Sequence, residues 1–69
     1  MAGAARAALS RRELQIAALA ASGSANRQIA ATLRLSPRTV ENRLHTAYEK
    51  LGIHGRDELA TALGRTARE

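Results

Sequence analysis

The segment LSPRTVENRLHTAYEKLGI, residues 35–53, is the longest part of the chain with one consistent helical pattern. Ser36 is suited to cap the helix start. Pro37 fits the first helical position, where a backbone N–H would have no partner within the helix. Gly52 ends the pattern because glycine readily adopts positive φ. The segment therefore predicts a helix from Pro37 to about Leu51.

This helix has two chemically different sides. With about 100° of rotation per residue, Leu44, Ala47 and Leu51 lie within about 40° of Val40. These four residues predict the face that packs on the core. Polar side chains occupy the opposite side and its two edges: Arg38, Glu41, Asn42, Arg43 and His45.

The polar side matches the chemistry of base recognition in DNA. Arg can bind guanine, Asn can bind adenine and Glu can accept from cytosine. An ordinary solvated surface is the alternative, but such a surface usually gains from opposite charges four residues apart. The pairs Arg38–Asn42, Glu41–His45 and Arg43–Ala47 provide no full salt pair. We therefore predict that this side contacts base edges.

A shorter helix precedes this one and can pack against it. Residues 25–33 carry an apolar stripe of Ile29, Ala30 and Leu33, with Ser24 as the candidate N-cap. Ala30 is small enough to let the two helices cross closely, as a helix-turn-helix requires. The turn between them would normally favour glycine where this chain has Arg34. Either the turn avoids the left-handed conformation there, or it tolerates about 1–2 kcal/mol of strain.

Two further helices complete the predicted fold. Ser10 and Glu13 have the spacing of a capping box, and Gly23 is suited to end that first helix. The last helix begins near Arg56 and is expected to end at Gly64. The predicted fold is all-α, a four-helix bundle that contains a helix-turn-helix, with helices at about 10–22, 25–33, 37–51 and 56–63.

Length and composition indicate one small helical domain, or a piece of a larger chain. It has 69 residues, 45% of them apolar, and sixteen of these are Ala. We expect a flexible segment or linker remnant over residues 1–8, a domain over 9–64 and a flexible tail over 65–69. There is no Cys, which excludes disulfides and fits a reducing cytoplasm. No apolar run is long enough to cross a membrane, so no membrane partner is expected.

The charge balance favours a polyanionic partner. Eleven Lys and Arg residues oppose six Asp and Glu, giving a net charge of +5, and ten of the eleven cations are Arg. The planar guanidinium suits phosphates and guanine edges. Basic composition alone also occurs in proteins with other roles, so the charge only supports a nucleic-acid partner.

An enzyme is not expected. The two histidines, His45 and His54, lie on different elements, and the sequence has neither a glycine-rich phosphate loop nor paired carboxylates on one face. We therefore predict no catalytic residues, no cofactor and no metal site.

Phosphate contacts are expected from groups at the helix starts. Backbone N–H groups and polar side chains at such positions commonly bind DNA phosphates. The candidates are Asn26 and Arg27 on the second helix, and Ser36, Arg38 and Thr39 on the third. Thr46, further along the third helix, is also predicted to contact phosphate.

Four blocks of residues in order resemble the LuxR-type (GerE-like) DNA-binding domain of bacterial transcription regulators. They are Leu9-Ser10-x-Arg12-Glu13, Gly23 followed by Asn26-Arg27-Gln28-Ile29-Ala30, Ser36-x-x-Thr39-Val40-Glu41-Asn42, and Lys50-Leu51-Gly52-Ile53 with Arg56-x-Glu58-Leu59. The resemblance covers about residues 9–63. It implies four helices, of which the second and third form the helix-turn-helix.

The resemblance also implies a function, a site and partners. The function would be sequence-specific binding of double-stranded DNA in the bacterial cytoplasm, at the nucleoid. Base or groove contacts are implied for Glu41, Asn42 and His45, and backbone contacts for Asn26, Arg27, Thr39 and Lys50. The fourth helix would form a homodimer contact on DNA, for which Ala60 and Leu63 are the candidates. RNA polymerase is a further partner to consider.

The chain departs from the family pattern at a few positions. Arg43 stands where the family commonly has His, which lengthens the side chain and can change base preference. Ala17 and Ala47 replace bulkier residues, which predicts a thin core. Ala25 lacks the usual capping Ser, and Gly55 stands where Ser is common.

Two alternatives remain open from the residues. Residues 39–45 also resemble the sigma-factor region that binds the −35 promoter element, although that element usually ends after its recognition helix. A helical module that binds a protein partner is the other alternative, supported by the apolar residues Leu59, Ala60 and Leu63.

Overall fold

The structure is a computed structural model that describes residues 9–68, with side chains described for residues 9–64. Within this range it contains four α-helices, one 3-10 turn and no strand. The elements are α2 (Arg11–Ala21), α3 (Asn26–Leu33), α4 (Pro37–Leu51), η1 (Arg56–Glu58) and α5 (Leu59–Arg68). The predicted all-α class is confirmed. The segment predicted over residues 1–8 lies outside the described residues, as does residue 69.

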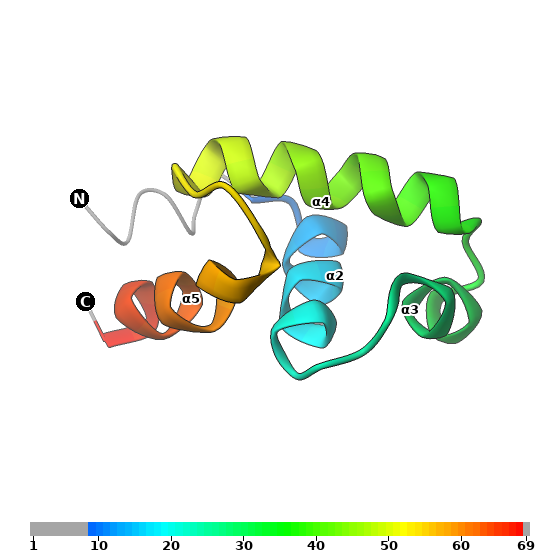
Figure 1. Ribbon diagram of the computed structural model, residues 1–69, viewed down its shortest axis with the longest axis horizontal. Coiled ribbons are helices and arrows are strands. Elements are labelled where there is room, and N and C mark those ends of the chain that lie inside the picture. Colours follow the sequence, from blue (N-terminus) through cyan, green and yellow to red (C-terminus); the bar gives the residue numbers. More distant parts are fainter. Residues whose placement is uncertain (1–8, 69) are drawn as a thin grey trace.

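Helix α2 forms the centre of the molecule. It contacts α3, α4 and α5, and α3 also packs against α4. Figure 1 shows α4 lying across the others, with α3 and α5 on opposite sides of α2. The pair α3 and α4 forms the predicted helix-turn-helix, and α2 and α5 support it from the other side.

Each helix contributes one large, fully buried side chain to the core: Ile16, Ile29, Val40 and Leu59. Small side chains fill the space between them. Ala17 and Ala47 are both completely buried, and Ala30 is only 3% exposed at the predicted helix crossing. The core is therefore built from few large side chains and closely spaced helices, as the alanine content predicts.

The predicted caps of α2 are confirmed. Ser10 Oγ accepts from the Glu13 N–H at 3.1 Å, and Glu13 Oε1 accepts from the Ser10 N–H at 2.8 Å. At the other end Gly23 has a φ of 101°, and its N–H donates to the Ala20 carbonyl at 3.1 Å. These local bonds satisfy backbone groups that a helix end leaves unpaired.

The start of α3 differs from the prediction. Its N-cap is Ala25, whose side chain has no hydrogen-bonding atom, and not Ser24. Gln28 compensates in part, because its Oε1 accepts from the Ala25 N–H at 2.8 Å. Of the two hydrogen bonds of a capping box, α3 therefore has only the one from the backbone of Ala25 to the side chain of Gln28.

Arg34 adopts the left-handed conformation that the turn of the helix-turn-helix requires. Its φ of 58° and ψ of 47° make it the one non-glycine residue with positive φ among the described residues. The Leu35 N–H then donates to the Ala30 carbonyl at 2.8 Å. Of the two alternatives for this turn, the chain uses the strained one, at about 1–2 kcal/mol.

Helix α4 has the predicted boundaries. Ser36 Oγ accepts from the Thr39 N–H at 3.1 Å, and Gly52 ends the helix with a φ of 70°. After the turn, the Ile53 N–H donates to the Tyr48 carbonyl at 3.0 Å, and the Ile53 side chain is buried. The turn therefore anchors the C-terminal end of α4 to the core.

The last helix is longer than predicted. A 3-10 turn covers residues 56–58, and α5 then continues through Gly64 to Arg68, so the prediction that Gly64 ends the helix is wrong. A glycine inside a helix costs only about 1 kcal/mol relative to alanine, and no proline follows it to stop the helix. The segment predicted as a tail over residues 65–69 is thus helical up to residue 68.

Candidate nucleic-acid interface

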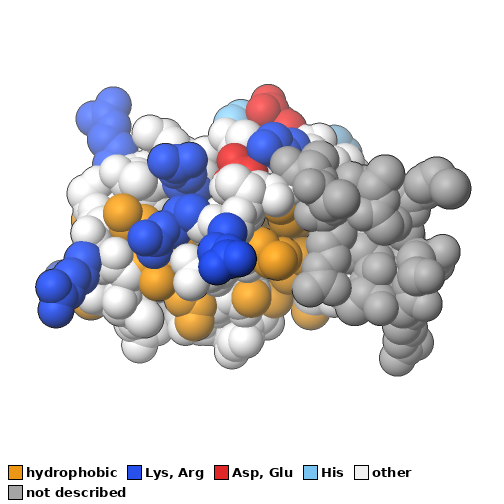
Figure 2. All heavy atoms as spheres, turned by 180° about the vertical axis from the view of Figure 1, so that it is seen from behind, with side chains coloured by type: hydrophobic (Ala, Val, Ile, Leu, Met, Phe, Trp, Pro, Cys, Tyr) orange, Lys and Arg blue, Asp and Glu red, His pale blue; other side chains and the backbone are white. Residues whose placement is uncertain are grey.

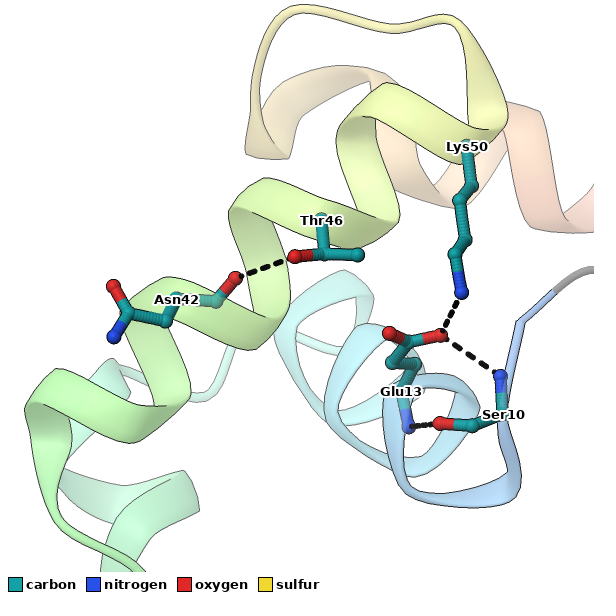
Figure 3. Close-up of polar contacts among 5 residues, drawn as sticks. All are labelled: Ser10, Glu13, Asn42, Thr46 and Lys50. Atoms are coloured by element: carbon teal, nitrogen blue, oxygen red, sulfur yellow. Dashed lines mark hydrogen bonds and ion pairs between the residues drawn. The ribbon is translucent and has the colours of Figure 1, made fainter.

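Helix α4 presents the two faces that its sequence predicts. Val40, Leu44 and Ala47 are buried, and Leu51 is partly buried against the same core. The polar set of Arg38, Glu41, Asn42, Arg43 and His45 is exposed throughout. Figure 3 shows the Asn42 side chain directed away from α2 and the body of the domain. The predicted base-edge residues therefore lie together on the outward side of one rigid helix.

One contact on this surface was not among the pairs considered in the sequence analysis. His45 Nε2 lies 3.5 Å from Glu49 Oε2, one helical turn further on. The two side chains are 76% and 69% exposed, and the histidine is charged only when protonated. An exposed pair of this kind contributes little and leaves both side chains able to move to another partner.

The hydroxyl groups of Ser36, Thr39 and Thr46 form hydrogen bonds within α4 and its cap. Ser36 and Thr39 are joined through their hydroxyl oxygens at 2.9 Å, in addition to the capping bond. Thr46 Oγ1 donates to the Asn42 carbonyl at 3.1 Å, as Figure 3 shows. Each hydroxyl oxygen can still accept or donate a further bond, so the predicted phosphate contacts of Ser36, Thr39 and Thr46 stay predictions.

The two predicted phosphate residues of α3 differ in their surroundings. Arg27 is exposed, whereas Asn26 is half-buried. Asn26 Oδ1 accepts from Nη2 of Arg56, and Nη1 of the same guanidinium donates to the Ser24 carbonyl. Arg56 is not among the residues that the sequence predicts for the interface. The only sign of its importance in the sequence is its place in the fourth block.

Lys50 has an internal partner that the sequence does not predict. Its Nζ lies 2.8 Å from Glu13 Oε1, the same oxygen that accepts from the Ser10 N–H (Figure 3). The Glu13 side chain is only 6% exposed. Lys50 thus joins the end of α4 to the start of α2, and its predicted phosphate contact stays a prediction.

The ion pair changes the acidity of Glu13. The hydrogen bond from Lys50, and then that from the Ser10 N–H, hold the pKa of Glu13 below its ordinary value of 4.5, although burial opposes this. The carboxylate therefore stays charged, and its negative charge is matched by the lysine.

A shallow, open hollow of about 500 Å³ lies beside the outward face of α4. It separates that face from the start of α3 and from η1. The lining residues are Asn26, Glu41, Asn42, Leu44, His45, Tyr48 and Arg56. Predicted base-edge residues and a predicted phosphate residue thus share one concave surface.

Positive charge spreads over the surface around α4. On the side of the molecule shown in Figure 2, Lys and Arg side chains gather over the described helices, and acidic side chains are visible only in the upper part of the view. Among residues 9–64, the exposed arginines are Arg11, Arg12, Arg27, Arg34, Arg38 and Arg43. This distribution suits a polyanionic ligand.

The two candidate dimer residues lie on α5. Ala60 is exposed, whereas Leu63 is partly buried against the core. Leu59 and Ala62, on the inward side of the same helix, are buried. Within residues 59–64, the exposed side of α5 therefore offers mainly small side chains to a neighbour.

Neither a metal site nor a membrane span is found in the part of the chain that the structure describes. No group of three or more His, Cys, Asp or Glu residues within residues 9–68 is placed to hold a metal ion. No helix in that range is long and apolar enough to cross a membrane.

Comparison with known families identifies the domain. The family model GerE, bacterial regulatory proteins of the luxR family, matches residues 7–63. The chain therefore belongs to the luxR family of bacterial regulatory proteins. It carries a DNA-binding regulatory domain with a helix-turn-helix, and the family is not one of enzymes. Comparisons with curated proteins and with solved structures gave no significant match.

Proposed function

We propose that this chain binds double-stranded DNA sequence-specifically, as the effector module of a bacterial transcription regulator, with α4 in the major groove. The observation that carries the proposal is the exposed polar face of α4. Helix α4 is fixed by buried residues on one side and offers donors and acceptors on the other, which is the arrangement that a recognition helix needs. Membership of the luxR family supports it.

The proposed base contacts follow from side-chain chemistry. Asn42 points straight outward and can form two bonds to adenine, and Arg38 and Arg43 can each bind guanine. Glu41 and His45 lie beside the hollow and complete the set. Because Arg43 is longer than the histidine common in the family, we expect it to set a base preference particular to this chain.

The proposed phosphate contacts surround this helix. Asn26 and Arg27 lie at the start of α3, and Ser36 and Thr39 at the start of α4. Helix starts carry partial positive charge and unpaired N–H groups, both of which favour phosphates. The net charge of +5 adds an attraction that does not depend on sequence.

Selection from a random pool of DNA duplexes tests the proposal. Binding of the selected duplex should weaken steeply with salt, and Asn42→Ala or Arg43→Ala should reduce discrimination between that duplex and a scrambled one by about tenfold. Gln15→Ala, at an exposed position of α2, is the matched control and should leave discrimination unchanged. Unchanged sequence preference in both α4 variants would show that α4 is not the recognition helix.

The same experiment addresses the alternatives. No enrichment from the pool at low salt would favour a module that binds a protein partner, such as another regulator or RNA polymerase. The sigma-factor alternative has less support, because the family match extends through residue 63 and so includes the start of α5.

The dimer and the cellular location belong to the same proposal. We propose that two copies bind two half-sites about one helical turn of DNA apart, with α5 of each copy at the dimer contact. Ala60 and Leu63 would lie in this contact. The expected location is the bacterial cytoplasm, at the nucleoid, where RNA polymerase is a further candidate partner.

A further inference from the structure

Arg56 joins the segment after α4 to the start of the helix-turn-helix. Its Nη1 donates to the Ser24 carbonyl, and its Nη2 donates to Asn26 Oδ1. The three residues are part-buried or half-buried. Since Arg56 is 30 residues from Asn26 in sequence, only the tertiary fold brings the two together.

The contact fixes which way the Asn26 amide faces. A guanidinium has five N–H donors and no acceptor, so only the amide oxygen can face it. The NH₂ group of Asn26 is therefore the end of the amide that does not bind Arg56, and it is left to donate to another acceptor. Without Arg56, rotation of the side chain would let either end of the amide face the solvent.

Asn26 occupies a position where such donors are useful. It is the first residue of α3, and it lines the hollow together with Asn42 and His45 of α4. A DNA strand whose bases contact the outward face of α4 would pass this hollow with its phosphates. The free donors of Asn26 would then meet a phosphate oxygen.

We propose that Arg56 is a positioning residue for DNA binding, which holds the Asn26 amide so that its NH₂ group donates to a backbone phosphate. The proposal rests on the proposed function. Glu41 also lines the hollow, so a free anion is not expected to bind there. The donors act on a duplex that the rest of the interface already holds.

Asn26→Asp tests the acceptor role of the Asn26 side chain separately from its donor role. The aspartate keeps an oxygen for Arg56, so folding is preserved, but it replaces the phosphate donors with a negative charge. We expect Asn26→Asp to melt no earlier than the wild type and yet to bind the selected duplex more than fivefold less tightly. Binding as tight as that of the wild type would overturn the proposal.

A double-mutant cycle with Arg56→Gln tests the positioning role. Alone, Asn26→Ala and Arg56→Gln should each weaken binding by about fivefold. Together they should weaken it little more than either one, because both remove the same phosphate contact. If the double variant lost affinity by the product of the two single-variant factors, the proposal would be overturned. Such a result would mean that Arg56 acts independently of Asn26.

The salt dependence of binding supplies a second readout. Arg56→Gln should leave the slope of binding against salt unchanged, because the phosphate contact is made by a neutral amide. If the slope corresponded to about one fewer counterion released on binding, the Arg56 charge itself would contact a phosphate. That result would overturn the positioning role. Arg11→Gln, on the exposed start of α2 and outside the hollow, removes the same charge and shows how far the loss of a general surface cation changes the slope.

All variants are compared below their melting temperatures as full chains. If the wild type enriched no duplex from the random pool, the proposed function would fail. If it bound a selected duplex but the Asn26 and Arg56 effects multiplied, only the positioning role would fail.

Discussion

A single residue, Arg34, determines the strain in the helix-turn-helix. Its left-handed conformation is required because the Leu35 N–H must turn back to the Ala30 carbonyl at 2.8 Å. The side chain is exposed and no hydrogen bond within the described residues holds it there. The packing of α3 against α4 therefore supports a conformation that the residue itself disfavours.

Replacing this residue with glycine should stabilise the domain. Glycine removes about 1–2 kcal/mol of left-handed strain and adds about 0.5–1 kcal/mol of chain entropy, so Arg34→Gly should gain about 0.5–1 kcal/mol. For a domain of this size the melting temperature should rise by a few degrees, measured by circular dichroism. Arg43→Gly, in the middle of α4, is the control and should lose about 1 kcal/mol. A loss of stability in Arg34→Gly would mean that Arg34 makes contacts that outweigh the strain.

The outward residues of α4 were predictable one by one because a helix repeats every 3.6 residues. Once Val40 was placed in the core, the exposure of Asn42 followed from geometry alone. Contacts between elements were not predictable in this way. The pairing of Lys50 with Glu13 and the bond between Arg56 and Asn26 had no counterpart in any local pattern.

At the scale of elements, the pair of Glu13 and Lys50 couples the start of α2 to the end of α4. Glu13 serves two purposes, because the oxygen that completes the cap of α2 also accepts from Lys50. The pair thus fixes the far end of α4 while Val40 and Leu44 fix its N-terminal half. The orientation of the proposed recognition helix depends on both.

This coupling should make stability sensitive to acid. The pKa of Glu13 is lowered in the folded state, so its contribution is complete above the ordinary value of 4.5 and is lost as the pH falls through the lower folded value. At neutral pH, Glu13→Gln should cost about 1–3 kcal/mol in urea unfolding. Because Gln does not titrate, the free energy of unfolding of the variant should fall less than that of the wild type as the pH drops below 4.5.

Glu49→Gln is the control for this effect, since the Glu49 side chain is 69% exposed. It should change the free energy of unfolding little at any pH. Parallel acid curves for the wild type and Glu13→Gln would show that other carboxylates cause the acid sensitivity.

At the scale of the whole molecule, the proposal places α5 at the contact with a second copy. Its inward side is committed to the core through Leu59 and Ala62, while Ala60 is exposed. A contact between small side chains allows two helices to approach closely, but it buries little apolar area. The proposed dimer is therefore expected to be weak in the absence of DNA.

Ala60→Glu tests the dimer contact. Two glutamates facing each other in a symmetric contact should repel, so cooperative binding to a duplex with two half-sites should fall, while binding to a single half-site changes little. Gel-shift titrations on the two duplexes measure this. Ala18→Glu adds the same charge at an exposed position of α2 and should preserve cooperativity. Cooperative binding by Ala60→Glu would place the dimer contact elsewhere.

The sequence by itself determined that there are four helices, the caps of α2 and α4, and the two faces of α4, because these depend on neighbours within about four residues. It also carried the motif that places the chain in the luxR family. Only the tertiary structure decided the conformation of Arg34, the continuation of α5 through Gly64, the partner of Lys50 and the contact of Arg56 with Asn26. The first two were decided by a balance of about 1 kcal/mol. The other two join residues 30 or more positions apart, which meet only after the helices have packed.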